Sequence, residues 1–125
     1  MEFDEQLSDK FFASRSGAPF TESGHRELLM ELFESGSGDP LRWSAARVHQ
    51  ALDDPYYDDY CRLPLEVVLD VPDLLRAFIP YAHVLSGIRE GLTAQALGVI
   101  DELRSGYKKE ILEQAQRMWG YDDAG

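Results

Sequence analysis

Cysteine is nearly absent from this sequence. The single cysteine, Cys61, has no second cysteine with which to form an internal disulfide. A secreted domain held together by disulfides is therefore excluded, and a reducing cytosol is the expected environment. We interpret Cys61 as a structural thiol, because no sequence typical of a catalytic cysteine surrounds it.

Long hydrophobic runs are also missing. The longest stretch without Asp, Glu, Lys or Arg lies between Arg76 and Arg89; it has 12 residues and contains Pro80. A membrane-spanning helix needs about 20 apolar residues, so we predict none. The acidic segment 1–5 lacks the basic and then apolar pattern of a secretory signal. We therefore expect a soluble, cytoplasmic protein.

Positive charge is scarce. The chain has 12 Lys and Arg residues against 23 Asp and Glu residues, which gives a net charge of −11. Direct binding to nucleic acid depends on basic side chains that neutralise several phosphates, and no segment here is basic. Nucleic-acid binding is therefore disfavoured. An acidic balance of this size is typical of a solvated surface, and it also suits a basic protein partner.

Apolar residues are plentiful enough for one folded domain. Hydrophobic residues make up 44% of the 125 residues. A chain of this length buries roughly two thirds of the surface that it exposes when unfolded. We predict a single helical domain over residues 1–125, with a frayed tail at 120–125.

The apolar residues recur at helical rather than strand spacing. Phe3, Leu7 and Phe11 lie four residues apart, which predicts a first helix. Ser44 is a good N-cap for a short helix, and Pro72 suits the first turn of another. Expected helices cover residues 3–13, 21–33, 44–53, 72–86 and 93–119, and residues 65–69 form either a short helix or an extended piece.

These patterns together predict an all-α fold. We expect a compact bundle of five to six helices with one proline-kinked central helix, because Pro80 falls inside the segment 72–86. The pair Ser105-Gly106 is expected to break the last helix. Ser86-Gly87 is expected to end the helix before it.

The most unusual composition lies in residues 53–60, which we call the acidic-aromatic segment. Tyrosines supply contact area and carboxylates attract a basic partner, so the segment suits protein docking. A bound cation is a weaker interpretation, because the acids do not follow calcium-loop spacing. A third interpretation is a solvated loop whose tyrosines pack on the core. The predicted protein-binding residues here are Tyr56, Tyr57, Asp58, Asp59 and Tyr60.

A second candidate contact surface is an apolar helix face. The helix expected after Pro72 carries apolar residues on more than one side, so it lies either at the centre of the bundle or partly against another chain. Such a chain could form a homodimer or a groove for a partner. The apolar anchors predicted for this surface are Phe78, Tyr81 and Trp119.

The histidines do not indicate a metal site. His25, His49 and His83 fall on three different expected helices, and the sequence has no His-Glu-x-x-His motif. We expect the first two at the surface and His83 in the core or in a groove. Whether the three converge is left open. We predict no catalytic, cofactor-binding or metal-binding residue and no cofactor.

A helix-turn-helix is an alternative interpretation of residues 41–52. A recognition helix needs side chains that reach the bases, and this segment offers Arg42, Arg47, His49 and Gln50. The acids Asp53 and Asp54 follow at once and would repel phosphates. DNA docking by this helix is therefore disfavoured.

Three short elements carry a resemblance to known sequences. They are Phe12-Ala13-Ser14, the segment 40–44 and the segment 72–78. With these, the chain resembles a group of uncharacterised actinobacterial proteins over most of its length, from about Phe11 to Tyr107. The shared motifs are structural, so the resemblance implies an all-helical bacterial cytoplasmic domain and carries over no site residues.

The sequence thus favours a non-catalytic protein-binding domain, adaptor or regulatory in kind. A transcription-linked regulator acting on DNA, or on a basic DNA-binding protein, is the first alternative. The second is an enzyme whose site combines distant side chains such as Asp73, Arg76 and His83.

Overall fold

The computed structural model describes residues 2–20, 23–34, 39–53, 55 and 63–119, and the predictions for the remaining residues lie outside it. Within this part the chain has six helices and no strand, which confirms the predicted all-α class. The helices are α1 (Glu2–Ala13), α2 (Ser23–Phe33), α3 (Ala45–Leu52), α4 (Leu65–Val68), α5 (Val71–Ser86) and α6 (Glu90–Trp119).

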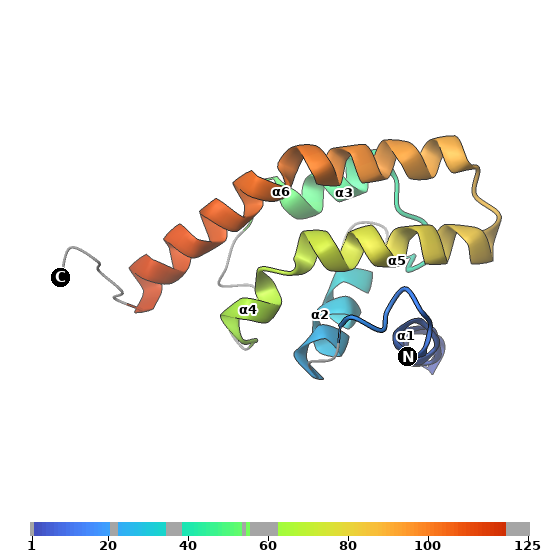
Figure 1. Ribbon diagram of the computed structural model, residues 1–125, viewed down its shortest axis with the longest axis horizontal. Helices are drawn as coiled ribbons and strands as arrows, with labels where there is room; N and C mark the ends of the chain where they lie inside the picture. Colours follow the sequence, from blue (N-terminus) through green and yellow to red (C-terminus); the bar gives the residue numbers. More distant parts are fainter. Residues whose placement is uncertain (1, 21–22, 35–38, 54, 56–62, 120–125) are drawn as a thin grey trace.

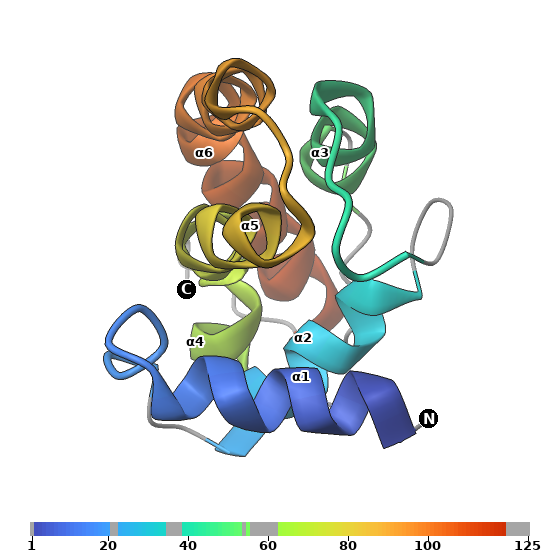
Figure 2. The same cartoon turned by 90° about the vertical axis from the view of Figure 1, so that its right-hand side faces the viewer.

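The two longest helices form one side of the bundle. α5 and α6 run antiparallel and side by side, joined by the short turn 87–89, and α3 packs on α6 (Figures 1 and 2). α2 contacts α1, α4 and α5 beneath this pair. Figure 2 shows α1 crossing the base of the molecule. α5 is therefore covered by α6 on one side and by α2 on the other, as expected for the central helix.

The aromatic centre of the core lies where α1, α2 and α5 meet. The Phe78 ring lies 5.1 Å from the Phe11 ring in an edge-to-face arrangement and 5.3 Å from the Phe33 ring, measured between centroids. Aromatic pairs at this distance add to the stabilisation that burial alone provides. All three side chains are fully buried or nearly so. These contacts fix which face of α5 points into the bundle.

Several helix ends follow the predicted chemistry. The Ser44 hydroxyl accepts a hydrogen bond from the Arg47 backbone N–H at 3.1 Å and so caps α3. Pro72 lies in the first turn of α5, where its missing N–H costs nothing. Gly87 has φ 72° and ends α5 in the left-handed conformation that glycine adopts without strain.

The last helix differs from its prediction. α6 begins at Glu90 rather than Thr93, and it continues through Ser105-Gly106 to Trp119, although Figure 1 shows a bend along its length. Gly106 has nothing within 4 Å of its Cβ position, so the bundle does not need a glycine there. Tyr107 beside it is buried, and its hydroxyl donates to the Val68 carbonyl at 2.9 Å. Packing of this kind outweighs the cost of one glycine, about 1 kcal/mol.

A buried arginine holds the link between α2 and α3. The Arg47 side chain donates to the carbonyls of Asp39 and of Arg42, the latter at 2.8 Å. It also donates to two carbonyls at the end of α2, Phe33 at 3.2 Å and Leu32 at 3.4 Å. Carbonyls at a helix end have no partner within the helix, so this guanidinium supplies one.

Trp43 completes the arrangement. The centre of the Arg47 guanidinium lies 3.7 Å from the centroid of the Trp43 ring, a close cation–π contact. The indole N–H donates to the Pro40 carbonyl at 3.1 Å. Burial lowers the pKa of Arg47 from its ordinary value, and the nearby Asp39 opposes that shift. The pKa of an arginine is so high that the side chain stays charged.

We predict that Arg47→Met destabilises the fold by about 3 kcal/mol, because it leaves several buried carbonyls without a donor. The matched control is Arg42→Met, which removes an exposed arginine from the same link and should change stability by less than about 0.5 kcal/mol. Urea unfolding followed by circular dichroism measures both. Equal losses in the two variants would contradict a structural role for Arg47.

Candidate functional site

The predicted acidic-aromatic contact residues lie outside the described part of the chain. This holds for Tyr56, Tyr57, Asp58, Asp59 and Tyr60. Trp119 is the last residue of α6, and its side chain is also outside the described part. The assignment of these residues to a contact surface therefore stays a prediction.

The two apolar anchors predicted on α5, Phe78 and Tyr81, are buried to different degrees. Phe78 is fully buried between Phe11 and Phe33, so its assignment to a contact surface is wrong. Tyr81 is half-buried, and its ring lies 5.5 Å from that of Phe11. Both side chains belong mainly to the core packing because α1 covers this face of α5.

His25 is buried, contrary to the surface position predicted for it. Its Nε2 lies 2.8 Å from Oδ2 of Asp70, and its ring packs edge-on against Phe20 at 5.3 Å. Asp70 directly precedes α5, so this contact joins the start of α2 to the start of α5. His49 is exposed, as predicted, with Nδ1 3.9 Å from a carboxylate oxygen of Asp53. Within the described residues, no group of three or more His, Cys, Asp or Glu side chains could hold a metal ion.

His83 uses both ring nitrogens in hydrogen bonds. Its Nε2 lies 3.1 Å from the Trp43 backbone N–H, which can only donate, so Nε2 accepts and carries no proton. The other nitrogen, Nδ1, lies 2.7 Å from Oγ1 of Thr93 and therefore donates to it. The Thr93 hydroxyl in turn is 3.5 Å from the Arg89 carbonyl. This chain of bonds fixes a neutral imidazole of one tautomer.

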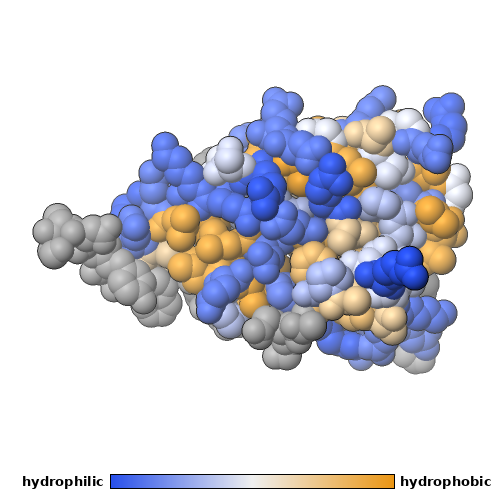
Figure 3. All heavy atoms as spheres, viewed as in Figure 1, coloured by the Kyte–Doolittle hydropathy of each residue, from blue (hydrophilic) through white to orange (hydrophobic). Residues whose placement is uncertain are grey.

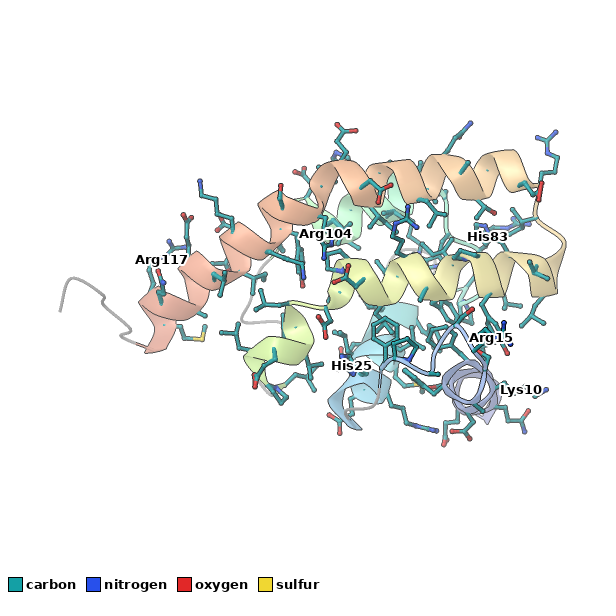
Figure 4. All side chains as sticks on the ribbon, in the orientation of Figure 1. Lys10, Arg15, His25, His83, Arg104 and Arg117 are labelled. Atoms are coloured by element: carbon teal, nitrogen blue, oxygen red, sulfur yellow. The ribbon has the colours of Figure 1, made fainter. Side chains whose placement is uncertain are left out.

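The environment agrees with that protonation state. Burial lowers the pKa of His83 from its ordinary value of 6.5. Figure 4 shows the side chain between α5 and α6. His83 is therefore a buried, neutral connector between α5, the start of α6 and the link before α3, which confirms the predicted core or groove position.

A hollow of about 450 Å³ opens beside His83. Three separate segments form its walls: the link before α3 with Trp43, the turn after α5 with Ile88, and the first turn of α6 with Leu92. A volume of this size lies within the range of small-molecule sites. Two arginines, Arg42 and Arg89, also line it.

These two arginines differ from the basic side chains at the α5–α6 contact. Within the described residues neither Arg42 nor Arg89 forms an ion pair. Elsewhere, basic side chains on α6 or α5 meet carboxylates across the α5–α6 contact. Those pairs are Arg76 with Asp101 at 2.8 Å, Arg104 with Asp73 at 2.8 Å, and Lys108 with Asp73 at 3.2 Å.

The same ion pairs bear on the enzyme alternative. Asp73 is partly buried, which raises its pKa, but hydrogen bonds from Arg104 and Lys108 outweigh this and lower the pKa from its ordinary value. Hydrogen bonding to Asp101 raises the pKa of Arg76. His83 lies ten residues after Asp73 on α5, which corresponds to about 15 Å along the axis of a helix. The structure therefore does not bring Asp73, Arg76 and His83 together.

The structure weakens the interpretation of α3 as a DNA-recognition helix, because Arg47, its central basic residue, is not available for binding. Arg47 is buried and bonded to backbone carbonyls, so it cannot reach a base or a phosphate. On α3 itself only His49 and Gln50 remain exposed among the candidate side chains, and neither carries a fixed positive charge.

Apolar side chains gather on the surface at the end of the molecule where α5 turns into α6. Exposed fractions are 81% for Val84, 56% for Leu85 and 45% for Leu92, and Ile88 between them is half-buried. We call these four residues the apolar tip. Figure 3 shows apolar surface at the corresponding right-hand edge. Large exposed apolar side chains at one end of a molecule suit an interaction site.

A second apolar region lies where α4 meets α6 (Figure 3). The exposed large apolar side chains in the second half of α6 are less accessible than Val84: Leu112 is 41% exposed, and Met118, further along the helix, is 43% exposed. Leu65 of α4 and Leu69 directly after it pack against the core. The apolar tip therefore contains the most exposed large apolar side chain of the described residues.

Comparisons of the chain with protein-family models, with curated proteins and with solved structures give no match. The resemblance to uncharacterised actinobacterial proteins accordingly stays a prediction. Of the helices in the described part of the chain, none combines the length and the apolar character needed to cross a bilayer.

The lowered pKa of His83 predicts a pH dependence of stability. The unfolded chain, with histidine near pKa 6.5, binds more protons than the folded chain, so the free energy of unfolding falls as the pH drops below 6.5. Urea unfolding between pH 7.5 and 5.5 should show this loss in the wild type and in His49→Gln. His83→Gln should be less stable at neutral pH and depend less on pH. If the free energy of unfolding of His83→Gln depended on pH as steeply as that of the wild type, the attribution of this pH dependence to His83 would be contradicted.

Proposed function

We propose that the protein is a non-catalytic, protein-binding helical domain and that the apolar tip is its contact surface. The observation that carries this proposal is the exposure of two consecutive apolar residues, Val84 and Leu85, at the end of the central helix. α5 turns its Phe78 face to α1 and α2, but no element in the described part of the chain covers the tip.

The energetics support contact at this place. Burying a fully exposed Val or Leu side chain contributes about 1.5–3 kcal/mol, and the partly exposed side chains of the tip contribute the corresponding fraction. Three such residues together can therefore supply the apolar centre of a small interface, although part of that gain offsets the cost of association. Val84 and Leu85 lie on α5 and Leu92 lies on α6, so the backbone that carries them is already helical before docking.

The chemistry near the tip favours binding over catalysis. His83 lines the hollow that adjoins the tip, and both of its nitrogens already have hydrogen-bond partners. A general base must be free to take a proton from the substrate. His83 holds the structure together instead.

The charge of the chain suggests a partner with basic surroundings. The net charge of −11 favours association with a positively charged surface. We retain the acidic-aromatic segment as a second contact region, on the strength of its sequence. In this proposal the tip supplies apolar anchoring and the segment supplies electrostatic attraction.

The tip can be tested with Val84→Ser/Leu85→Ser, which removes the two most exposed apolar side chains without changing charge. Tagged wild-type and variant proteins are used to capture partners from extracts of producing cells, with nuclease present. A protein that binds the wild type stoichiometrically should be lost from this variant. Because the replaced side chains are exposed, the fold should stay intact, and circular dichroism checks this.

The matched control is Leu112→Ser/Met118→Ser, which removes two exposed apolar side chains from the second half of α6, outside the apolar tip. It should retain the partner at the wild-type level. Loss of the partner from the control and retention by the tip variant would transfer the site to the second half of α6 and contradict the proposal. Light scattering of the purified protein identifies the case in which the captured partner is a second copy.

The acidic-aromatic segment has its own test. Tyr57→Ala/Tyr60→Ala removes two aromatic side chains, so affinity for the same captured partner should fall by about tenfold while helicity is unchanged. Titration of the purified partner with wild type and variant measures this. Unchanged affinity would remove the segment from the contact surface without affecting the tip.

A further inference from the structure

We propose that the hollow beside His83 is a binding site for a small amphiphilic anion, a molecule with one carboxylate or phosphate head and an apolar body. This site adjoins the apolar tip, but Val84 and Leu85, the two most exposed residues of the tip, do not line the hollow. Ile88 and Leu92 belong to both surfaces, at their boundary.

The apolar half of the ligand is indicated by the walls. Trp43, Ala45, Ile88 and Leu92 face a space of about 450 Å³ from three segments of the chain. Apolar and aromatic walls with a few polar groups are typical of small-molecule sites. Trp43 is held in place from behind by its contact with Arg47, so the wall exists before a ligand arrives.

The charged half is indicated by Arg42 and Arg89. Both line the hollow, and within the described residues neither has an ion-pair partner, although the chain carries 23 acidic residues against 12 basic ones. The basic side chains across the α5–α6 contact are paired with carboxylates. Lys10, Arg15 and Lys109 also form no ion pair within the described residues, so the distinguishing feature of Arg42 and Arg89 is their shared position at one apolar hollow. Two arginines at such a position favour an anionic head, for which the guanidinium fork is well suited.

His83 does not alter this preference. As a neutral imidazole with both nitrogens bonded, it adds no charge and no free donor to the site. Its role is to hold Trp43 against α5 and α6, the segments that form the other walls. Recognition of the head therefore depends on the arginines and recognition of the body on the apolar walls.

The proposal is tested with three probes on the full chain: decanoate, decanol and acetate, each below its aggregation concentration. ¹H–¹⁵N correlation spectra follow the signals of the Trp43 indole and of Ala45 and Gln95, which border the hollow. Decanoate should shift these signals in a saturable way. Decanol and acetate should bind at least about tenfold more weakly, because each lacks one half of the ligand.

Charge recognition is tested by Arg42→Ala/Arg89→Ala, which should weaken decanoate binding by about tenfold or more. The matched control, Arg15→Ala/Arg117→Ala, removes the same charge from two exposed positions that do not line the hollow; Figure 4 labels both residues. It should bind within twofold of the wild type. Decyl phosphate in place of decanoate distinguishes the two head groups.

Three results would overturn the proposal. The first is equal binding of decanol and decanoate to the wild type, which would show that the anion is not recognised. The second is the absence of saturable shifts at the hollow. The third is equal weakening in the two arginine variants. The first two use the wild type alone, so they hold even if a variant folds poorly, and none depends on the protein contact at the tip.

Discussion

Most of the arrangement depends on the hydrogen bonds that the Arg47 guanidinium donates to backbone carbonyls. It joins the end of α2 to the link before α3 through backbone carbonyls, and Trp43 lies against it. From the opposite side His83 accepts the Trp43 backbone N–H. One short link is thus held between two buried side chains, and its position sets where α3 meets α6. The hollow and its two arginines exist because the link is fixed in this way.

Local chemistry made much of the fold predictable. A cap at Ser44, a first-turn proline at 72 and a left-handed glycine at 87 act over a few residues, and each ends or begins a helix where expected. The buried polar contacts were not predictable. Arg47 meets a carbonyl 15 residues away, and His25 meets a carboxylate 45 residues away. Spacing patterns contain no information about such distant partners, so His25 was wrongly expected at the surface.

The candidate site was less predictable than the fold. The sequence shows that α5 is apolar on more than one face, but it does not show which face its neighbours cover. Phe78 proved to be covered by Phe11 and Phe33, whereas Val84 is exposed. In the same way, arginines look alike in sequence. Only the fold separates Arg76, which is paired with a carboxylate across α5 and α6, from Arg89 at the hollow.

The claim that the apolar tip is a protein contact is tested most directly by photo-crosslinking in producing cells. A photo-activatable phenylalanine derivative replaces Val84 in one version of the protein and Leu112 in another, both exposed positions on helices. We predict one discrete crosslinked species from position 84 and none from position 112. Equal crosslinking from both positions, or crosslinking from 112 alone, would contradict the claim and assign the contact to another surface.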